Sequence, residues 1–201
     1  MKKLFLILTL SLGVSVFHLA SDASASENNS YPTLKEINQL NEELQILVDE
    51  ANEKLENGEE NIEVSSENMT LGFNVKDNTT VSKNNVGIQA IGSKSYQAFV
   101  ANTSGFNFRH GVSGKFTWDG SLLKAITYVE DLSGTMYGKS ASTNIQGVDG
   151  TIGRDAKIGK LTSKGTFTAL KWSPISYYTT LVVDFYAPTK SYRIITAKIS
   201  S

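Results

Sequence analysis

His110 is the residue through which nucleophilic or general-base chemistry in this chain would have to pass. The sequence contains two histidines and no cysteine, and the other histidine, His18, lies in an apolar N-terminal segment. A Ser-His-Asp triad would need His110 as its base, and a zinc site would need most of its ligands elsewhere. His110 also occupies the apolar register of an alternating stretch, where a hydrogen-bonded, partly buried imidazole is the ordinary outcome. We therefore interpret His110 as a structural residue.

Paired carboxylates offer another route to catalysis, because glycoside hydrolysis needs only two Asp or Glu side chains at a defined separation. Asp119 and Asp149 each precede a glycine, and turns explain them. Asp184 fits strand patterning less well, since it lies between Val183 and Phe185. A carboxylate-based polysaccharide hydrolase is thus one alternative. Its candidate acids are Glu130, Asp131, Asp149, Asp155 and Asp184.

Signals for phosphate, cofactor and metal binding are missing from the sequence. Residues 147–153 (GVDGTIG) are rich in glycine, but no Gly-Lys-Ser/Thr and no helix pattern follow them. The lack of cysteine excludes disulfides, a thiolate nucleophile and zinc–cysteine sites. We expect no cofactor, no metal ion and no nucleic-acid partner, and we expect that the protein is not an enzyme.

Aromatic and basic residues form the best candidate for a binding surface. Tyr177 and Tyr178 are adjacent, so in a strand they face opposite sides and one ring stands outside the core. Aromatic rings beside basic side chains can bind a sugar, a peptide or a lipid headgroup, although tyrosines are also ordinary half-buried strand formers. The candidate binding residues are Trp118, Trp172, Tyr177, Tyr178, Tyr186, Tyr192, Lys171, Lys190 and Arg193.

Residues 1–25 have the pattern of a secretory signal peptide. The basic start Met1-Lys2-Lys3 precedes an apolar run, and Ala23-Ser24-Ala25 matches the small-residue site that signal peptidase cleaves. The run is slightly short for a membrane anchor, which needs about 20 strongly apolar residues. We expect a secreted, extracellular protein that begins at Ser26. The Lys-Lys start, the many Asn, Lys and Ser residues and the lack of cysteine resemble small exported proteins of Gram-positive bacteria, without a motif specific to one family.

Charge divides the remaining chain into two parts. Residues 26–63 contain 11 acidic and 2 basic residues, whereas residues 64–201 contain 8 acidic and 15 basic ones. We predict an acidic segment of helix and linker at 26–63 and a basic β domain at 64–201. The opposite charges lead to the hypothesis that the helix covers the basic or aromatic face and moves when a ligand competes.

Residues 34–56 are predicted to form one amphipathic helix. Thr33 and Glu36 have the spacing of a capping box, and Asn57-Gly58 suits a helix C-cap. The pattern also fits three coiled-coil heptads, so the helix could pack on its own β domain, on a protein partner or on a second copy. We favour its own domain or a partner. The apolar residues that define the stripe are Ile37, Leu40, Leu44, Leu47 and Ala51.

The rest of the chain has the period-two pattern of β-strands. In residues 106–118 (FNFRHGVSGKFTW) every second residue is apolar, aromatic, Gly or His, and Asp119-Gly120 then suits a tight hairpin turn. Short alternating runs recur between turn residues, and no spacing fits crossover helices. The predicted fold class is therefore mainly β: an N-terminal amphipathic helix followed by an antiparallel β-meander closed as a barrel or sandwich.

Three functions are compatible with these patterns. The first is a secreted, non-enzymatic binding or interaction protein at the bacterial cell envelope or outside the cell, with a cell-wall polymer, a peptide or a membrane headgroup as ligand. The second is a secreted antibacterial or membrane-active protein that acts through its helix, although such helices are usually basic and this one is acidic. The third is the carboxylate hydrolase. We favour the first function.

Overall fold

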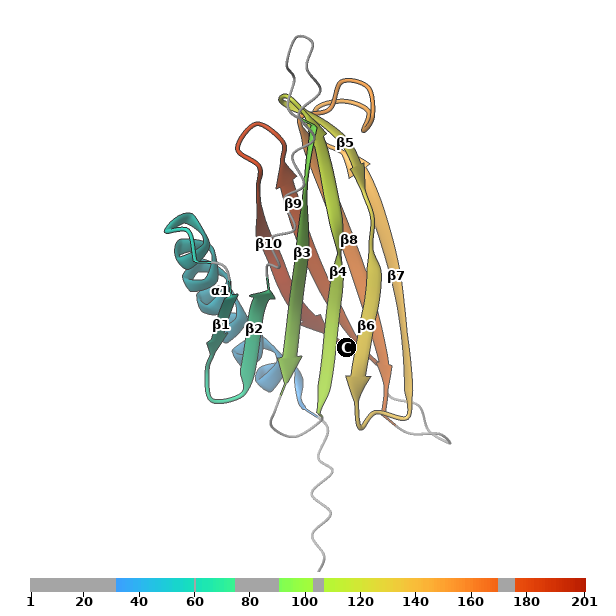
Figure 1. Ribbon diagram of the computed structural model, residues 1–201. Coiled ribbons are helices and arrows are strands. Elements are labelled where there is room, and N and C mark those ends of the chain that lie inside the picture. The colour runs from blue at the N-terminus through green and yellow to red at the C-terminus, as the bar shows by residue number, and fades with distance from the viewer. Residues whose placement is uncertain (1–31, 60, 75–90, 103–106, 170–175) are drawn as a thin grey trace, which may run out of the picture.

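The computed structural model describes residues 32–59, 61–74, 91–102, 107–169 and 176–201. Within them the protein is mainly β, with one N-terminal helix and two antiparallel sheets (Figure 1). The predicted signal peptide and the candidates Lys171 and Trp172 lie outside the described residues. The elements are α1 (Leu34–Glu56), β1 (Asn61–Ser65), β2 (Met69–Asn74), β3 (Ile91–Asn102), β4 (Phe108–Asp119), β5 (Leu122–Ile126), β6 (Val129–Gly134), β7 (Gly138–Gly147), β8 (Ile158–Thr168), β9 (Ser176–Tyr186) and β10 (Ser191–Ser200).

Helix α1 begins and ends where the sequence predicts. The Thr33 hydroxyl accepts a hydrogen bond from the Glu36 backbone N–H at 3.3 Å, and the Glu36 carboxylate accepts one from the Thr33 N–H at 2.6 Å. These two bonds satisfy backbone donors that the first turn would otherwise leave unpaired. Gly58, just past the C-cap residue Asn57, has a φ of 84°, which suits glycine. The capping box and the C-terminal signal are therefore both confirmed.

The apolar stripe of α1 packs on the chain's own strands. The helix lies against β10, β1 and β2, and the residues expected in a coiled-coil seam are buried there. A coiled coil through this stripe would therefore have to pull the helix out of its own core. The buried stripe consists of Ile37, Leu40, Leu44, Leu47, Val48 and Ala51.

The six-stranded sheet has the order β1-β2-β3-β4, and β5 and β6 both pair with β4. Strand β4 begins at Phe108 and contains most of the alternating stretch 106–118. Gly120 has a φ of 59° and is the first of two loop residues between the paired Asp119 and Leu122, an arrangement typical of a type II′ turn. The predicted turn is present, but Asp119 is the last strand residue and not part of the loop. The buried residues of β4 include Phe108, His110, Val112, Phe116 and Trp118.

The four-stranded sheet has the order β10-β9-β8-β7 and contains only antiparallel pairs. Strands β7 and β8 pair without a register shift from Gly138 to Gly147. Strand β10 is irregular between Ile194 and Thr196, where one extra residue, Ile195, is inserted opposite β9.

The described strands form no closed barrel. Strands β6 and β7 follow each other in the chain, but β6 pairs with β4 and β7 pairs with β8. Side chains bridge the two strands instead: Thr143 on β7 donates to the Glu130 carboxylate at 2.6 Å, and the Tyr128 hydroxyl donates to the Thr143 carbonyl at 3.4 Å. The two sheets therefore stay separate ladders.

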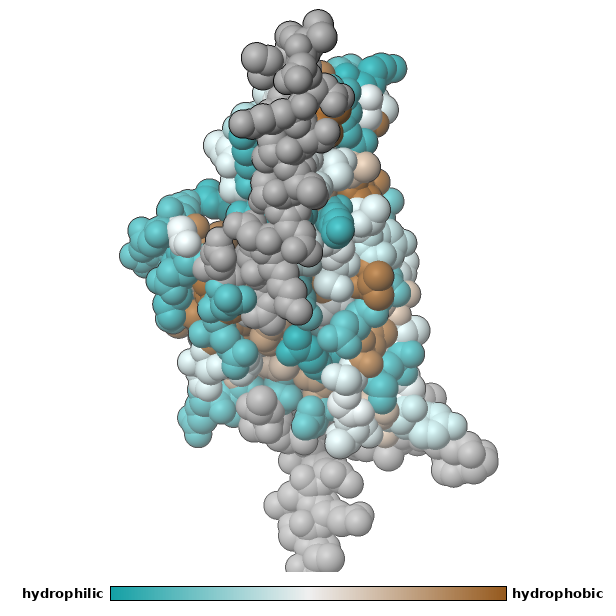
Figure 2. All heavy atoms as spheres, viewed as in Figure 1, coloured by the Kyte–Doolittle hydropathy of each residue, from teal (hydrophilic) through white to brown (hydrophobic). Residues whose placement is uncertain are grey.

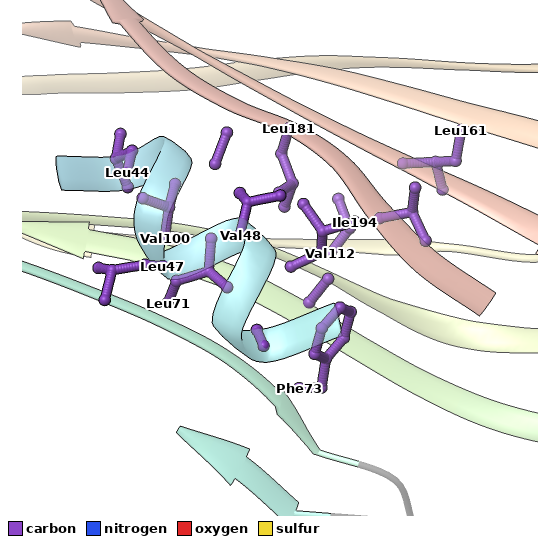
Figure 3. Packing of buried hydrophobic residues seen from close by; sticks show 14 of the residues in the cluster. Leu44, Leu47, Val48, Leu71, Phe73, Val100, Val112, Leu161, Leu181 and Ile194 are labelled. Atoms are coloured by element: carbon purple, nitrogen blue, oxygen red, sulfur yellow. The ribbon is translucent and has the colours of Figure 1, made fainter. Parts of the chain in front are cut away.

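Helix and sheets share one hydrophobic core. Leu44, Leu47 and Val48 of α1 lie among residues from both sheets, as Figure 3 shows. At the centre, the Phe116 ring lies 5.2 Å from the Phe185 ring between centroids. Strand β1 runs across residue 63, where we expected the acidic segment to end, and its Ile62 and Val64 belong to the same core as the helix.

Two asparagines of α1 bind the outer edge of β10. The Asn41 side chain donates to the Ile199 carbonyl at 2.9 Å and accepts from the Ile199 N–H at 2.8 Å. The Asn52 side chain does the same with Ile194, at 2.7 Å and 3.2 Å. Each amide thus replaces the pair of backbone hydrogen bonds that another strand would make. An edge that could otherwise recruit a foreign strand is thereby covered.

Replacing Leu44 with Ala should destabilise the protein by about 2–5 kcal/mol, because it empties a fully buried position between helix and sheets. Ile46 is 67% exposed on the same helix, so Ile46→Ala should change the free energy of unfolding by less than about 1 kcal/mol. Urea denaturation measures both values. Equal effects of the two substitutions would show that α1 is not packed as described.

Replacing Asn52 with Ala should leave the Ile194 N–H and carbonyl unpaired beneath the helix and destabilise the protein by about 1–3 kcal/mol. The Ile194 amide should also exchange its hydrogen faster, which hydrogen-exchange NMR measures. Asn38→Ala is the matched control, since Asn38 is exposed on the same helix. Unchanged exchange at Ile194 would contradict the edge contact.

Candidate functional site

Three of the predicted binding residues belong to the core. Trp118, Tyr177 and Tyr192 are only 3%, 2% and 1% exposed. Each lies on the inward side of its strand; Tyr192, for example, is paired with the buried Phe185. We expected these rings to contribute to a surface, but the structure buries them, so a ligand on the outside cannot contact them.

The other predicted residues that the structure describes come together at β9 and β10. Tyr178 is 45% exposed, and Tyr186 is half-buried on the same side of β9. Arg193 lies on β10 opposite Asp184. Lys190 is exposed in the turn between the two strands and has a φ of 55°, a conformation that non-glycine residues rarely adopt.

These residues are part of a larger surface, which we call the basic face. It consists of the outward side chains of β7–β10, and the strand register arranges them in rows across the sheet. One row is Ser142–Lys164–Thr180–Lys198, and the next but one is Gln146–Lys160–Asp184–Arg193. Between them lies the row of Asn144, Thr162, Val182 and Thr196. The outward positions of the four strands contain one acidic residue, Asp184, and four basic ones, Lys160, Lys164, Arg193 and Lys198.

Charge on the basic face is compensated in one row and not in the other. Lys160 Nζ lies 3.9 Å from Asp184 Oδ1, and Arg193 forms an ion pair with Glu56 at the C-terminal end of α1. Among the described residues, Lys164 and Lys198 form no ion pair. Of the two rows, the Lys164–Lys198 row therefore holds the unpaired positive charge, and Lys190 in the adjoining turn is also outside any ion pair of the described residues.

Asp184 is unusually buried for a carboxylate on an outer face. It is 9% exposed, and this burial raises its pKa, although the nearby Lys160 ammonium acts in the opposite direction. Burial, and then the Asp184 carboxylate, raise the pKa of Tyr186. Asp184, which strand patterning alone did not explain, thus faces outward but sits beneath its neighbours.

The outer face of the six-stranded sheet is organised differently. The Arg109 guanidinium lies 3.6 Å from the centre of the Phe99 ring and forms an ion pair with Asp131 at 3.2 Å. The Phe99 ring in turn covers Gly72, where an added Cβ would meet it at 2.4 Å. Figure 2 shows hydrophobic residues reaching the surface over β5 and β6, among hydrophilic ones. The Arg109 guanidinium on this face is thus already held by the Phe99 ring and the Asp131 carboxylate.

A chain of buried hydrogen bonds centred on His110 connects the two sheets. Thr179 Oγ1 lies 2.7 Å from His110 Nδ1, and His110 Nε2 lies 2.9 Å from Ser163 Oγ. Ser163 Oγ lies 2.8 Å from Thr143 Oγ1, which donates to Glu130 Oε1 at 2.6 Å. These five residues come from β9, β4, β8, β7 and β6, so the chain passes through the core from one strand to the next.

The Glu130 carboxylate sets the direction of the bonds from Thr143 to His110 Nε2, since a carboxylate can only accept. Thr143 gives its single hydroxyl proton to Glu130 and must accept from Ser163. Ser163 must then accept from the protonated Nε2 of His110, and the bare Nδ1 accepts from Thr179. Burial lowers the pKa of His110 to about 4 and so keeps the imidazole neutral, which leaves Nδ1 free to accept from Thr179.

The His110–Ser163 pair has the distance of a catalytic dyad but none of its access. His110, Ser163 and Thr179 are all 0% exposed, and a threonine occupies the place where a triad has its carboxylate. The two acids that seemed most suited to hydrolysis, Glu130 and Asp184, are also apart. Glu130 bonds to Thr143, which faces inward from the four-stranded sheet. Asp184 lies on the outer face of that four-stranded sheet.

Among the described residues, no three His, Asp or Glu side chains lie close enough to hold a metal ion. Within the same residues, no helix combines the length and the hydrophobicity needed to cross a membrane. No protein-family model matches the chain, and no curated protein or solved structure matches it either. A functional proposal therefore depends on the surfaces themselves.

Acidification should destabilise the protein through His110. The unfolded imidazole takes up its proton near its ordinary pKa of 6.5, whereas burial delays this to about pH 4 in the fold. Between these values the unfolded state binds more protons, so the free energy of unfolding falls as the pH is lowered, by up to about 3 kcal/mol. Urea denaturation between about pH 7.5 and 4 measures this loss.

His110→Gln is the control for this pH dependence, because glutamine keeps a donor and an acceptor but does not titrate. Its free energy of unfolding should change less between pH 6.5 and 5. An imidazole that titrates near its ordinary pKa in NMR spectra of the folded protein would contradict the buried, neutral assignment.

Proposed function

We propose that this is a secreted, non-enzymatic binding protein that acts at the bacterial cell envelope or outside the cell, and that the basic face is its binding surface. Secretion is supported by the pattern of residues 1–25. The choice of surface is supported by the grouping of Tyr178, Tyr186, Lys190 and Arg193 on or beside one sheet face.

One observation carries the choice of surface: the basic face is open although the helix and both inner faces are buried. On β9, inward residues such as Leu181 and Val183 are fully buried, while Tyr178, Thr180 and Val182 alternate with them and reach solvent. Side chains that make no contribution to the core are available for recognition. Hydroxyl, ammonium and aromatic groups on one sheet face suit a polar, extended ligand.

A non-enzymatic role is supported by the burial of the one described histidine and by the separation of Glu130 from Asp184. The membrane-active alternative needs the apolar stripe of α1, which is occupied in the core. We infer that the scaffold is a β-sandwich rather than a barrel, with α1 covering one open side. Such a scaffold holds the basic face rigid without covering it.

Blocking the basic face should weaken binding to isolated Gram-positive cell walls, chosen because the sequence resembles small exported proteins of Gram-positive bacteria. The chain has no cysteine, so Ser142→Cys can be labelled selectively with a maleimide-linked polyethylene glycol. Ser142 is exposed in the Lys164–Lys198 row. The labelled protein should cosediment with walls at least about tenfold less well than the unlabelled one.

Ser133→Cys, labelled in the same way, is the matched control. Ser133 is exposed on β6 of the other sheet, opposite Arg109, and its label should leave cosedimentation unchanged. Equal binding of both labelled proteins would reject the basic face. Failure of the unlabelled protein to cosediment would reject the envelope as its place of action.

A further inference from the structure

The chemistry of the ligand can be inferred from the arrangement of the cations, provided that the basic face is the binding surface proposed above. Lys164 and Lys198 flank Thr180 in one row and are separated by two strand spacings, about 10 Å. Lys160 precedes Lys164 by four residues on the same side of β8, about 13 Å along the strand. The backbone positions of the cations are therefore spread over the sheet instead of surrounding one point, which favours an extended ligand over a single small anion.

The row of uncompensated charge runs across the strands. Lys164 and Lys198 are exposed and form no ion pair with the described residues, and hydroxyl groups lie between and beside them at Thr180 and Ser142. Ammonium and hydroxyl groups both donate hydrogen bonds to anionic oxygens, and charged acceptors strengthen such bonds. We propose that the basic face takes a linear polyanion, which lies across β7–β10 along the row from Ser142 to Lys198.

A polymer fits this surface better than a lipid bilayer. Binding at a bilayer surface needs apolar side chains that enter the headgroup region. Of the large hydrophobic side chains on β7–β10, Tyr178 and Ile195 are exposed, and they lie on different strands. Val182 lies half-buried in the row next to the lysines, whereas the other neighbouring outward positions are polar. Charge complementarity with only isolated apolar side chains is typical of polyanion binding, where neutralising charge along the polymer releases counterions.

Glu56 acts as an internal competitor for part of this surface. It forms an ion pair with Arg193 at the edge of the basic face, so a polyanion that extends past the lysine row has to displace the Glu56 carboxylate to use that guanidinium. The charge of the helix had suggested that it covers the basic face, but it does not. Only the Glu56 carboxylate, at the C-terminal end of the helix, reaches the edge of this face.

Fluorescence anisotropy with dye-labelled inorganic polyphosphate, at low and high sodium chloride, tests the proposal on the full chain. Wild type should bind, and binding should weaken as salt increases. The double variant Lys164→Gln/Lys198→Gln should bind about tenfold more weakly and with a shallower salt dependence, because it displaces fewer counterions. Lys115→Gln is the control: Lys115 is exposed on the outer face of the other sheet, and its loss should not matter.

A second pair of variants tests the competitor. Glu56→Gln frees Arg193 and should tighten polyphosphate binding about two- to threefold, within the range expected for one exposed ion pair. Glu53→Gln removes an equal charge from the exposed side of the same helix and should have a smaller effect. Equal tightening by both would mean that Glu56 acts only through net charge and would reject its role as competitor.

The experiments distinguish rejection of the polyanion as ligand from rejection of the basic face as the binding surface. If wild type cosediments with walls through the Ser142 side but does not bind polyphosphate, the face stands and the polyanion is rejected. Unchanged affinity in the double lysine variant also rejects it. Binding to vesicles of anionic lipid without binding to polyphosphate would replace the polymer with a membrane surface.

Discussion

The structure depends on how the unpaired edge of β10 is covered. A strand edge at the margin of an apolar core exposes backbone donors and acceptors that are costly to bury without partners. Helix α1 meets this constraint with two side-chain amides, Asn41 and Asn52, placed three helical turns apart so that each reaches one β10 residue. The apolar stripe between them fills the space beneath, among residues of both sheets. Packing and backbone satisfaction thus come from one helix, which explains why an acidic segment is integral to a basic β structure.

A second constraint acts inside the core. The five-residue chain from Thr179 to Glu130 introduces polar groups where the surroundings are apolar, and it is tolerated because every donor has an acceptor. Its direction follows from one carboxylate near the margin of the sheets, so a surface-near charge determines the tautomer of a fully buried imidazole. The same burial that keeps His110 neutral also keeps it from any substrate. What resembles catalytic chemistry in the sequence is, in the fold, a connection between strands.

The basic face is open because of the position that α1 takes. Helix α1 lies at the edge of the four-stranded sheet and not on its outer surface, since its amides must reach the β10 edge and its stripe must reach the core. The outward residues of β7–β10 are then left with solvent, except at the rim where Glu56 pairs with Arg193. On the other sheet, Phe99, Arg109 and Asp131 contact one another and leave less free charge. The difference between the two outer faces follows from side chains, not from backbone topology.

The sequence by itself determined the local structure: the helix from its capping box to Asn57-Gly58, the alternating strands, and the turn at Gly120. These features depend on residues close together in the chain, where the periods of helix and strand are visible. Alternation shows that Tyr177 and Tyr178 face opposite sides, but it does not say which side is the core, so Tyr177, Tyr192 and Trp118 were assigned to a surface. Only the tertiary structure decided this, and only it brought Lys164 beside Lys198 and Asn52 beside Ile194. Those pairs depend on strand register and helix docking over long sequence separations, and no local pattern records either of them.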